Sequence, residues 1–215
     1  MLATSAQAQA LVELFHKGTR LNYKKGEFII RHGESPSSVF YIESGLVKAY
    51  DITKYGEENL LIVRKDKEIF PLIWAITGKE RDVVYETLIP TTVWRLDHKT
   101  YLNALKNNSD FLLPMLDQVV EMYRLHSERI INLEYRSVRE RLVSFLLTMA
   151  SRFGESTEQG LTVGVPLKQQ DIASSINSSR ETTSRELTYL EKKGLIENKR
   201  ICIIIKNKAA LEKIL

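Results

Sequence analysis

The sequence predicts an α+β protein built from an antiparallel β-roll, a long helix and a winged helix-turn-helix. Short β-branched and aromatic runs alternate with Gly and Pro turns over residues 20–96, a rhythm typical of an antiparallel roll or barrel. Apolar side chains recur at heptad spacing within residues 110–135. Residues 167–196 are typical of two short helices joined by a tight turn. We therefore divide the chain into residues 1–109, 110–135 and 136–215.

The composition is that of an ordinary globular protein. The chain has 215 residues, of which 43% are hydrophobic, and this suffices for one large or two modest cores. No apolar run approaches a membrane span, and the N-terminal MLATSAQAQALVELF lacks the basic start and long apolar segment of a signal peptide. We expect a cytoplasmic location and no membrane partner. Cys202 is the only cysteine, which excludes an intrachain disulfide and a cysteine-ligated zinc site or cluster within one chain.

The first part of the chain predicts one helix followed by a series of short strands. Residues 1–18 are typical of an amphipathic helix with Leu11, Leu14 and Phe15 on its apolar side. Turn signals then recur at Gly26, Gly33, Pro36, Gly45, Gly56, Gly78 and Pro90. We expect strands at residues 21–23, 27–31, 39–51 (a pair that turns at Gly45), 59–64, 68–70, 85–88 and 91–96. A helical stretch begins near Asp97.

The predicted long helix carries a narrow apolar seam. Its members are spaced 4, 3, 4, 3, 4 and 3, and they are Leu112, Leu116, Val119, Tyr123, His126, Ile130 and Leu133. Pro114 falls in the first turn, where its missing N–H costs little. The seam could pack on its own domain, but the chain offers no second long helix of matching length. A parallel homodimer is the simpler interpretation, with His126 as a polar residue that sets the register or as a ligand contact.

The third part begins with a helix over residues 135–153, whose inward side chains are Val138, Leu142, Phe145, Leu146 and Met149. A surface loop at residues 154–160 and a strand at 161–165 follow. The first helix of the helix-turn-helix covers 169–176 and buries Ile172, Ala173 and Ile176. Asn177 tolerates the left-handed backbone of a sharp turn. The second helix starts near Ser179, ends at Gly194, and turns Thr183, Leu187 and Leu190 inward. The β-branched run 199–206 with basic ends predicts a wing.

The outer face of the second helix carries polar side chains suited to reading bases. They are Arg180, Glu181, Ser184, Arg185 and Thr188, on the turns that meet base edges when such a helix enters the major groove. Arg pairs bidentately with guanine, and Glu accepts from the cytosine amino group. Two alternatives remain. The face could be solvated, with Arg180–Ser184 and Glu181–Arg185 pairs, or Ser178 and Glu181 could form a capping box.

The charge distribution favours a nucleic-acid partner for the third part. Residues 135–215 hold 14 Lys and Arg against 9 Asp and Glu, whereas the rest of the chain holds 17 against 18. The basic surplus therefore lies in the helix-turn-helix segment, as phosphate binding requires, although chance could produce a surplus of this size. We expect phosphate contacts from Lys168, Ser179, Thr188, Lys199 and Arg200.

The order of these parts resembles the CRP/FNR family of bacterial transcription regulators, over nearly the whole chain. The most specific matches are Gly26, Gly33-Glu34, the strand pair 39–50 with its turn at Gly45, and the segment from Ser179 to Arg185. The resemblance implies a cyclic-nucleotide-binding-like roll, a homodimer on double-stranded DNA, and RNA polymerase as a partner. It also implies palindromic sites with TGA half-sites, base contacts from Arg180, Glu181 and Arg185, and a role for Ser184 similar to that in the FNR branch.

The effector site departs from the family's cyclic-nucleotide binders. Those proteins carry Phe-Gly-Glu and then Arg-Ser/Thr-Ala, whereas this chain has Phe70-Pro71-Leu72 and Arg81-Asp82-Val83. Pro71 removes an N–H donor, Leu72 removes the ribose-binding carboxylate, and Asp82 would repel a phosphate. We expect no cAMP binding, and the single cysteine excludes the FNR-type iron–sulfur cluster. Another small-molecule effector would contact Phe70, Leu72, Trp74, Arg81, Tyr123 and His126.

Other classes of function have weaker support. No nucleophile, base or metal set converges, and Cys202 has no evident His partner, so we expect no enzyme and identify no cofactor. His16, His32 and His98 are scattered, and His32 with Glu34 is more typical of a solvated turn than of a metal site. The alternatives to an effector-controlled regulator are an effector-independent regulator and a signalling module that binds no DNA. The second would not need Arg180, Glu181 and Arg185 on one helix face.

Overall fold

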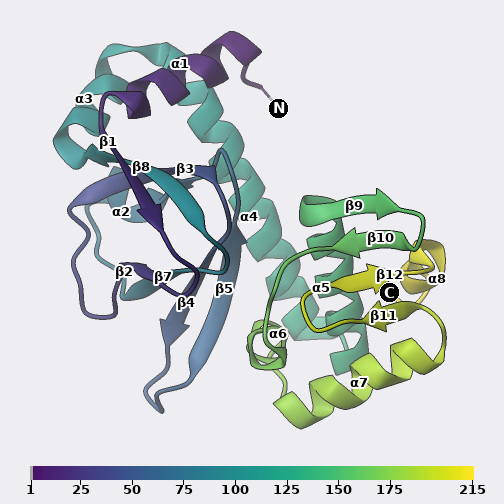
Figure 1. Ribbon diagram of the computed structural model, residues 1–215. Coiled ribbons are helices and arrows are strands. Elements are labelled where there is room, and N and C mark those ends of the chain that lie inside the picture. The colour runs from purple at the N-terminus through teal and green to yellow at the C-terminus, as the bar shows by residue number, and fades with distance from the viewer. Residues whose placement is uncertain (1) are drawn as a thin grey trace. The chain divides into compact units, whose positions relative to one another are not determined.

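The computed structural model describes residues 2–215 and divides into two compact units (Figure 1). The first comprises the chain up to Glu57 together with Leu61–His126, and the second comprises Glu58–Leu60 with Ser127–Leu215. The division therefore falls inside the long helix, whereas the sequence places the last boundary after that helix, at residue 136. No helix within residues 2–215 is both long enough and apolar enough to cross a membrane.

The first unit contains the expected antiparallel roll. One sheet has the strand order β1-β8-β3-β6 and the other β2-β7-β4-β5. The bounds are β1 Thr19–Tyr23, β2 Phe28–Ile30, β3 Ser38–Ser44, β4 Val47–Ile52, β5 Glu58–Arg64, β6 Ile69–Phe70, β7 Val83–Thr87 and β8 Thr91–Asp97. The predicted turn glycines do adopt positive φ, and at Gly45 (φ 112) a Cβ would collide with Thr91.

Helices that precede and follow the strands of the roll in the sequence pack against it. α1 (Ser5–His16) buries Leu11, Leu14 and Phe15 as predicted. α3 (His98–Asn107) begins at Asp97, whose carboxylate accepts a hydrogen bond from the Thr100 N–H at 3.0 Å. The short helix α2 (Leu72–Thr77) was not predicted, because its sequence LIWAIT is too short to show helical periodicity. It buries Leu72 and Trp74 in a hydrophobic cluster with α1 and α3.

The long helix α4 (Leu112–Tyr135) follows a single 3₁₀ turn, η1 (Ser109–Phe111). Pro114 lies in its first turn, as predicted, and is its one buried residue among those described. In a helix of 24 residues with so little burial, most of the apolar stripe is exposed.

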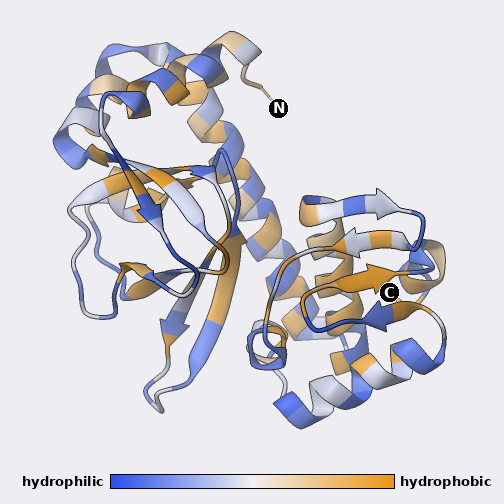
Figure 2. Ribbon diagram, viewed as in Figure 1, coloured by the Kyte–Doolittle hydropathy of each residue, from blue (hydrophilic) through white to orange (hydrophobic). Residues whose placement is uncertain are grey.

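The second unit packs helices α5 to α8 and a four-stranded sheet into a winged helix-turn-helix. The strand order is β11-β12-β10-β9, and Figure 2 shows β12 as an apolar strand whereas α7 is mostly polar. The bounds are α5 Val138–Phe153, β9 Gly154–Thr157, β10 Gly160–Val163, α6 Gln169–Ser175, α7 Arg180–Lys192, β11 Ile196–Asn198, β12 Ile203–Ile205 and α8 Lys208–Glu212. The predicted loop 154–160 is wrong, because its first residues pair with β10 as β9.

Candidate nucleic-acid interface

The turn between α6 and α7 has the geometry that its sequence predicts. Ile172, Ala173 and Ile176 are buried. Asn177 adopts the left-handed conformation with φ 49, and the Ser178 N–H then donates to the Ala173 carbonyl at 2.9 Å. Ser178 therefore closes the turn and cannot cap α7. The cap is Ser179, whose hydroxyl accepts from the Thr182 N–H at 3.1 Å, so the Ser178–Glu181 capping box is wrong.

The inner face of α7 anchors the helix in the core. Thr183, Leu187 and Leu190 are almost fully buried, and Gly194 ends the helix region with φ 68. Both findings confirm the predicted periodicity and stop signal. The helix is therefore fixed on one side, and its opposite side is free to meet a ligand.

The outer face of α7 presents the predicted base-reading side chains to solvent. Arg180, Glu181, Arg185 and Thr188 are exposed and Ser184 is half-buried. The Arg185 guanidinium donates to the Thr182 hydroxyl at 3.0 Å, and the Thr188 hydroxyl donates to the Ser184 carbonyl at 2.9 Å. These short-range bonds hold Arg185 and Thr188 along the helix while leaving most of the Arg185 donors available.

Glu181 is held as an anion at the start of α7. Its pKa lies below the ordinary value because its own backbone N–H and the Ser179 hydroxyl stabilise the carboxylate, with smaller contributions from Arg180 and Arg185. An ionised carboxylate only accepts hydrogen bonds. Glu181 is therefore suited to an amino group such as that of cytosine and unsuited to a phosphate.

The predicted wing is a hairpin that begins before residue 199, at β11. β11 pairs with β12 in antiparallel register, and the Lys199 N–H donates to the Cys202 carbonyl at 2.9 Å to close the turn. Residues 199–202 therefore form the tip, with Ile201 66% exposed. The Lys199 ammonium lies 3.0 Å from the Gln159 side-chain oxygen and 3.2 Å from Glu197. A phosphate at this position would compete with both partners.

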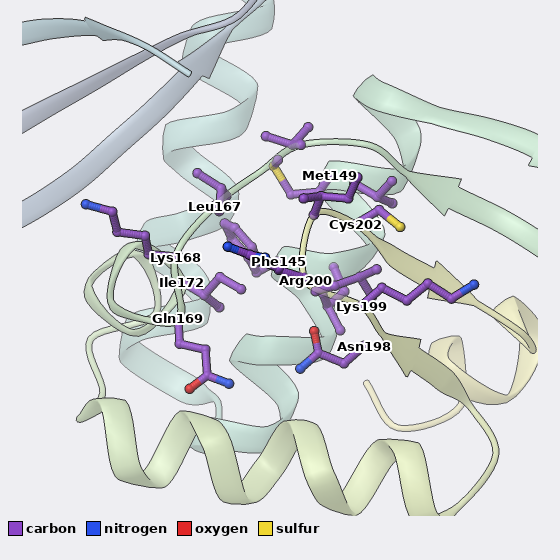
Figure 3. A pocket seen from close by; sticks show the side chains of 15 residues that line it. Phe145, Met149, Leu167, Lys168, Gln169, Ile172, Asn198, Lys199, Arg200 and Cys202 are labelled. Atoms are coloured by element: carbon purple, nitrogen blue, oxygen red, sulfur yellow. The ribbon is translucent and has the colours of Figure 1, made fainter. Parts of the chain in front are cut away.

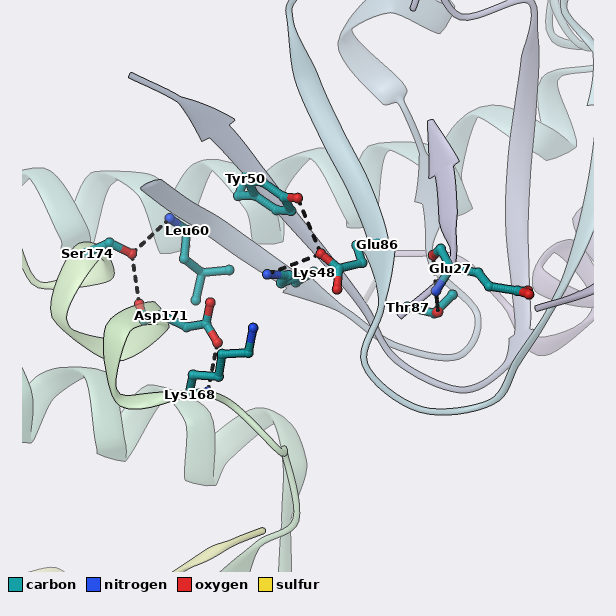
Figure 4. Close-up of polar contacts among 9 residues, drawn as sticks. All are labelled: Glu27, Lys48, Tyr50, Leu60, Glu86, Thr87, Lys168, Asp171 and Ser174. Atoms are coloured by element: carbon teal, nitrogen blue, oxygen red, sulfur yellow. Dashed lines mark hydrogen bonds and ion pairs between the residues drawn. The ribbon is translucent and has the colours of Figure 1, made fainter. Parts of the chain in front are cut away.

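A cavity of about 300 Å³ separates the wing from the start of α6 and from α5. Lys168, Lys199 and Arg200, which are three of the five predicted phosphate contacts, all line it, and Figure 3 shows their side chains around the hollow. Asp171 fixes the start of α6, because its carboxylate accepts from the Lys168 N–H at 2.7 Å (Figure 4). The structure therefore gathers basic groups from two separate segments beside α7. Gln169 and Asn198 also line the cavity, and no spacing signal in the sequence identified them.

The residues expected to contact an effector do not form one site. Phe70 is fully buried and stacks between Phe40 and Tyr85, with ring centroids 5.3 Å and 4.7 Å away. Leu72 and Trp74 belong to a different hydrophobic cluster. Arg81 is exposed.

The remaining predicted pocket residues, Tyr123 and His126, lie on α4, where Tyr123 is 74% exposed and His126 is half-buried. Asp82 is engaged elsewhere: its carboxylate accepts from the Gly33 N–H at 2.7 Å and lies 3.0 Å from His32 Nδ1. Phe70 is thus packed against other aromatic rings, and an effector contact that involves it stays a prediction. Within residues 2–215, no group of three or more His, Cys, Asp and Glu is arranged to hold a metal ion.

The predicted seam of α4 is an exposed apolar surface. The exposed fractions of its apolar members run from 36% at Leu133 to 74% at Tyr123. Val120 and Ile131, which lie beside the seam, are also exposed. An apolar stripe of this length on a water-facing helix is typical of a surface that another helix covers.

Comparisons with known proteins agree with this geometry. Residues 20–108 match the family described as cyclic nucleotide-binding domain, and residues 140–214 match the Crp-like helix-turn-helix domain. The chain belongs to the CRP/FNR family of transcription regulators. The match to the helix-turn-helix domain covers most of α5 and all of α6, α7 and α8, and it includes all the predicted base-reading residues.

Individual relatives are similar over most of the chain. The global nitrogen regulator of Nostoc sp. is 28% identical over 81% of this chain and 79% of that protein. The transcriptional activator protein FnrA of Stutzerimonas stutzeri is 26% identical over 87% of this chain and 76% of that protein. A CooA mutant from Carboxydothermus hydrogenoformans shares the fold, with a TM-score of 0.78, 21% identity, and coverage of 94% of this chain and 89% of that one. The chain is a DNA-binding transcription regulator of this family.

Proposed function

We propose that the protein acts as a homodimer that reads a palindromic promoter site with TGA-type half-sites. The observation that carries this proposal is the exposed face of α7, which presents Arg180, Glu181 and Arg185 together. The same unit gathers Lys168, Lys199 and Arg200 around one cavity. Arg185 would take guanine and Glu181 the paired cytosine. Ser184 would contact an adjacent base, and Lys168, Ser179, Thr188, Lys199 and Arg200 would contact phosphates.

The exposed seam of α4 supports the dimer. A two-fold dimer through parallel α4 helices would place two copies of α7 on one DNA face, so that the symmetry of the protein matches a palindrome. By family resemblance, RNA polymerase is the protein partner and the cytoplasm the location. A gel shift with DNA fragments from the organism's own promoters tests the proposal. Retardation of a subset of fragments supports it, and uniform retardation or none contradicts it.

We further propose that cAMP is not the effector. Phe70 and Tyr85 occupy the interior of the roll as stacked rings, Pro71 offers no N–H donor, and Leu72 is buried among apolar groups. An effector of another kind remains part of the proposal. The packed interior favours a second candidate, which is a regulator that needs no effector. Isothermal calorimetry with cAMP should show no heat of binding, and micromolar affinity would contradict this part of the proposal.

A further inference from the structure

Two arginines in the first turn of α5 contact α7 and the turn before it, on the side away from the exposed face of α7. Arg139 and Arg141 lie two positions apart in α5. Their partners lie in the turn before α7 and in α7 itself, and all of them belong to the second compact unit. The predicted base and phosphate contacts include neither arginine.

Arg141 is bonded in three directions to main-chain carbonyls. Its Nε donates to the Ile176 carbonyl at 2.8 Å and its Nη2 to the Asn177 carbonyl at 3.1 Å. Its Nη1 donates to the Arg136 carbonyl at 2.9 Å. Ile176 and Asn177 form the sharp turn that sets the angle between α6 and α7. Arg136 precedes the Ser137 cap of α5. One planar guanidinium therefore joins the junction of α4 and α5 to the turn before α7.

Arg139 supplies a second attachment, on α7 itself. Its Nε lies 2.6 Å from Glu186 Oε2, and its guanidinium carbon lies 3.7 Å from the centroid of the Tyr189 ring. Glu186 and Tyr189 are three residues apart and therefore adjacent on one side of α7. The ion pair and the ring contact fix the rotation of α7 about its own axis. The buried Leu187 and Leu190 hold α7 on the core, and the ion pair and the ring contact add directional restraint to that packing.

We propose that Arg139 and Arg141 are positioning residues that set the orientation of α7 for base reading. The proposal rests on the proposed function, since it assigns these residues to the accuracy of DNA recognition. Base contacts require side chains at defined positions in the groove, so a small rotation of α7 would weaken several contacts together. A lysine cannot replace Arg141, because an ammonium on a flexible stem lacks the rigid fork that reaches three carbonyls.

The first test compares Arg141→Lys with Arg152→Lys. Both substitutions retain the positive charge, and Arg152 lies in the last turn of the same helix. Affinity is measured for the palindrome and for an unrelated duplex of equal length at one salt concentration. We expect Arg141→Lys to bind the palindrome roughly tenfold to a hundredfold less tightly, with the unrelated duplex unaffected. Its loss of preference should spread over the half-site, whereas Arg185→Ala should lose preference at one base pair.

The second test exchanges the charges of the Arg139–Glu186 pair. Arg139→Glu and Glu186→Arg should each reduce the ratio of palindrome affinity to unrelated-duplex affinity. The double variant should recover at least part of that ratio, because it restores an ion pair between the same two helices. A double variant that is no better than the single ones would contradict the role of Arg139.

A measurement without DNA separates this proposal from the proposed function. Residual dipolar couplings of the α5 and α7 amides in the full chain report the angle between the two helices. Arg141→Lys should change that angle, and Arg152→Lys should leave it as in the wild type. An unchanged angle overturns the positioning role even where the wild type prefers the palindrome. A changed angle in a protein that shows no sequence preference supports the role and contradicts the proposed function alone.

Discussion

The outer face of α7 and the interior of the β-roll differ in whether their side chains are available to bind a ligand. On α7, Arg180, Glu181 and Arg185 are exposed on a helix that its buried side holds in place. In the roll, Phe70 is stacked between two other rings and fully buried. A surface with unused donors and acceptors on a rigid support is suited to binding. An interior whose groups are already packed must open before it can bind anything.

The outer face of α7 is therefore accessible to a ligand as it stands, whereas a ligand in the part of the roll that holds Phe70 would have to displace packed rings. Opening the roll interior would separate Phe40, Phe70 and Tyr85, and aromatic pairs of this kind contribute about 0.5–1.5 kcal/mol each beyond their burial. A ligand would have to supply at least that free energy. The five predictions below test this comparison, beginning with the substitution expected to have the largest effect.

The dimer seam should give the largest effect. Val119→Glu combined with Ile130→Glu places charges in the apolar stripe, so we expect monomers in sedimentation equilibrium and the loss of palindrome binding. Ile131→Glu is the matched control, because Ile131 is exposed on α4 beside the seam. It should leave the dimer intact. A double variant that stays dimeric would show that α4 does not pair through this seam.

Arg185 should give the next largest effect. Arg185→Ala removes the donors predicted for guanine, and we expect a loss of roughly 1–3 kcal/mol in binding the palindrome with relaxed choice at one base pair per half-site. Competition binding against single-substituted sites measures both quantities. Thr188→Ala is the comparison on the same helix: it removes a proposed phosphate contact, so it should weaken binding to all sequences by a similar factor and leave the base preference unchanged. Equal losses on every sequence would make Arg185 a phosphate contact.

Glu181→Ala separates base reading from helix capping. Ser179 is the cap of α7, so Glu181→Ala should leave the melting temperature close to that of the wild type, whereas Ser179→Ala should cost about 0.5–2 kcal/mol of stability. The base pair that Glu181 reads should become degenerate. A Glu181 variant that loses stability yet keeps its half-site preference would reverse this assignment.

The pH dependence of the Glu181 contact follows from its depressed pKa. A carboxylate whose pKa is lowered in the folded state contributes fully to the stability of that state above the unfolded value of about 4.3. This contribution is lost only as the pH falls through the lower folded value, so the group stays ionised at neutral pH. We therefore expect the same preference at this base pair at pH 6 and at pH 8. A change between these two pH values would assign the preference to another group.

Lys199→Ala should have a smaller effect on palindrome binding than Arg185→Ala or Glu181→Ala. In the free protein its ammonium already contacts Gln159 and Glu197, so part of its attraction for a phosphate is offset by the bonds that it must break. Lys199→Ala should weaken all DNA sequences by a similar factor and reduce the slope of the salt dependence by about 1. Titrations at several salt concentrations give that slope, and a sequence-dependent loss would indicate a base contact.

Local periodicity predicted the parts of the fold that a single segment determines. Leu187 and Leu190 face the core, Asn177 is left-handed, and Pro114 lies in the first turn of α4, all as expected. β9 was missed, because Gly154–Thr157 becomes a strand only through pairing with β10. The capping box of Ser178 and Glu181 stayed open as an alternative because sequence spacing alone cannot tell which of two adjacent serines caps α7; the structure shows that it is Ser179.

The sequence could predict that the proposed base contacts lie together, because those residues share one helix. Arg180, Glu181 and Arg185 are brought to one face by helical spacing alone. The effector residues come from three distant segments, and only tertiary packing decides whether these meet. The positioning contacts of Arg139 and Arg141 were missed for the same reason. Arg141 donates to main-chain carbonyls, which every residue has, so the side chains of its partners carry no pattern that predicts the contact.

The most direct measurement is a selection of DNA duplexes from a library with randomised half-sites, carried out with the wild type, Glu181→Ala and Arg185→Ala. The account predicts that the wild type enriches palindromes with a TGA core. It predicts that each variant loses preference at one base pair per half-site and keeps the rest. Unchanged preferences in both variants, or no enriched palindrome with the wild type, would contradict the assignment of the outer face of α7 as the reading surface.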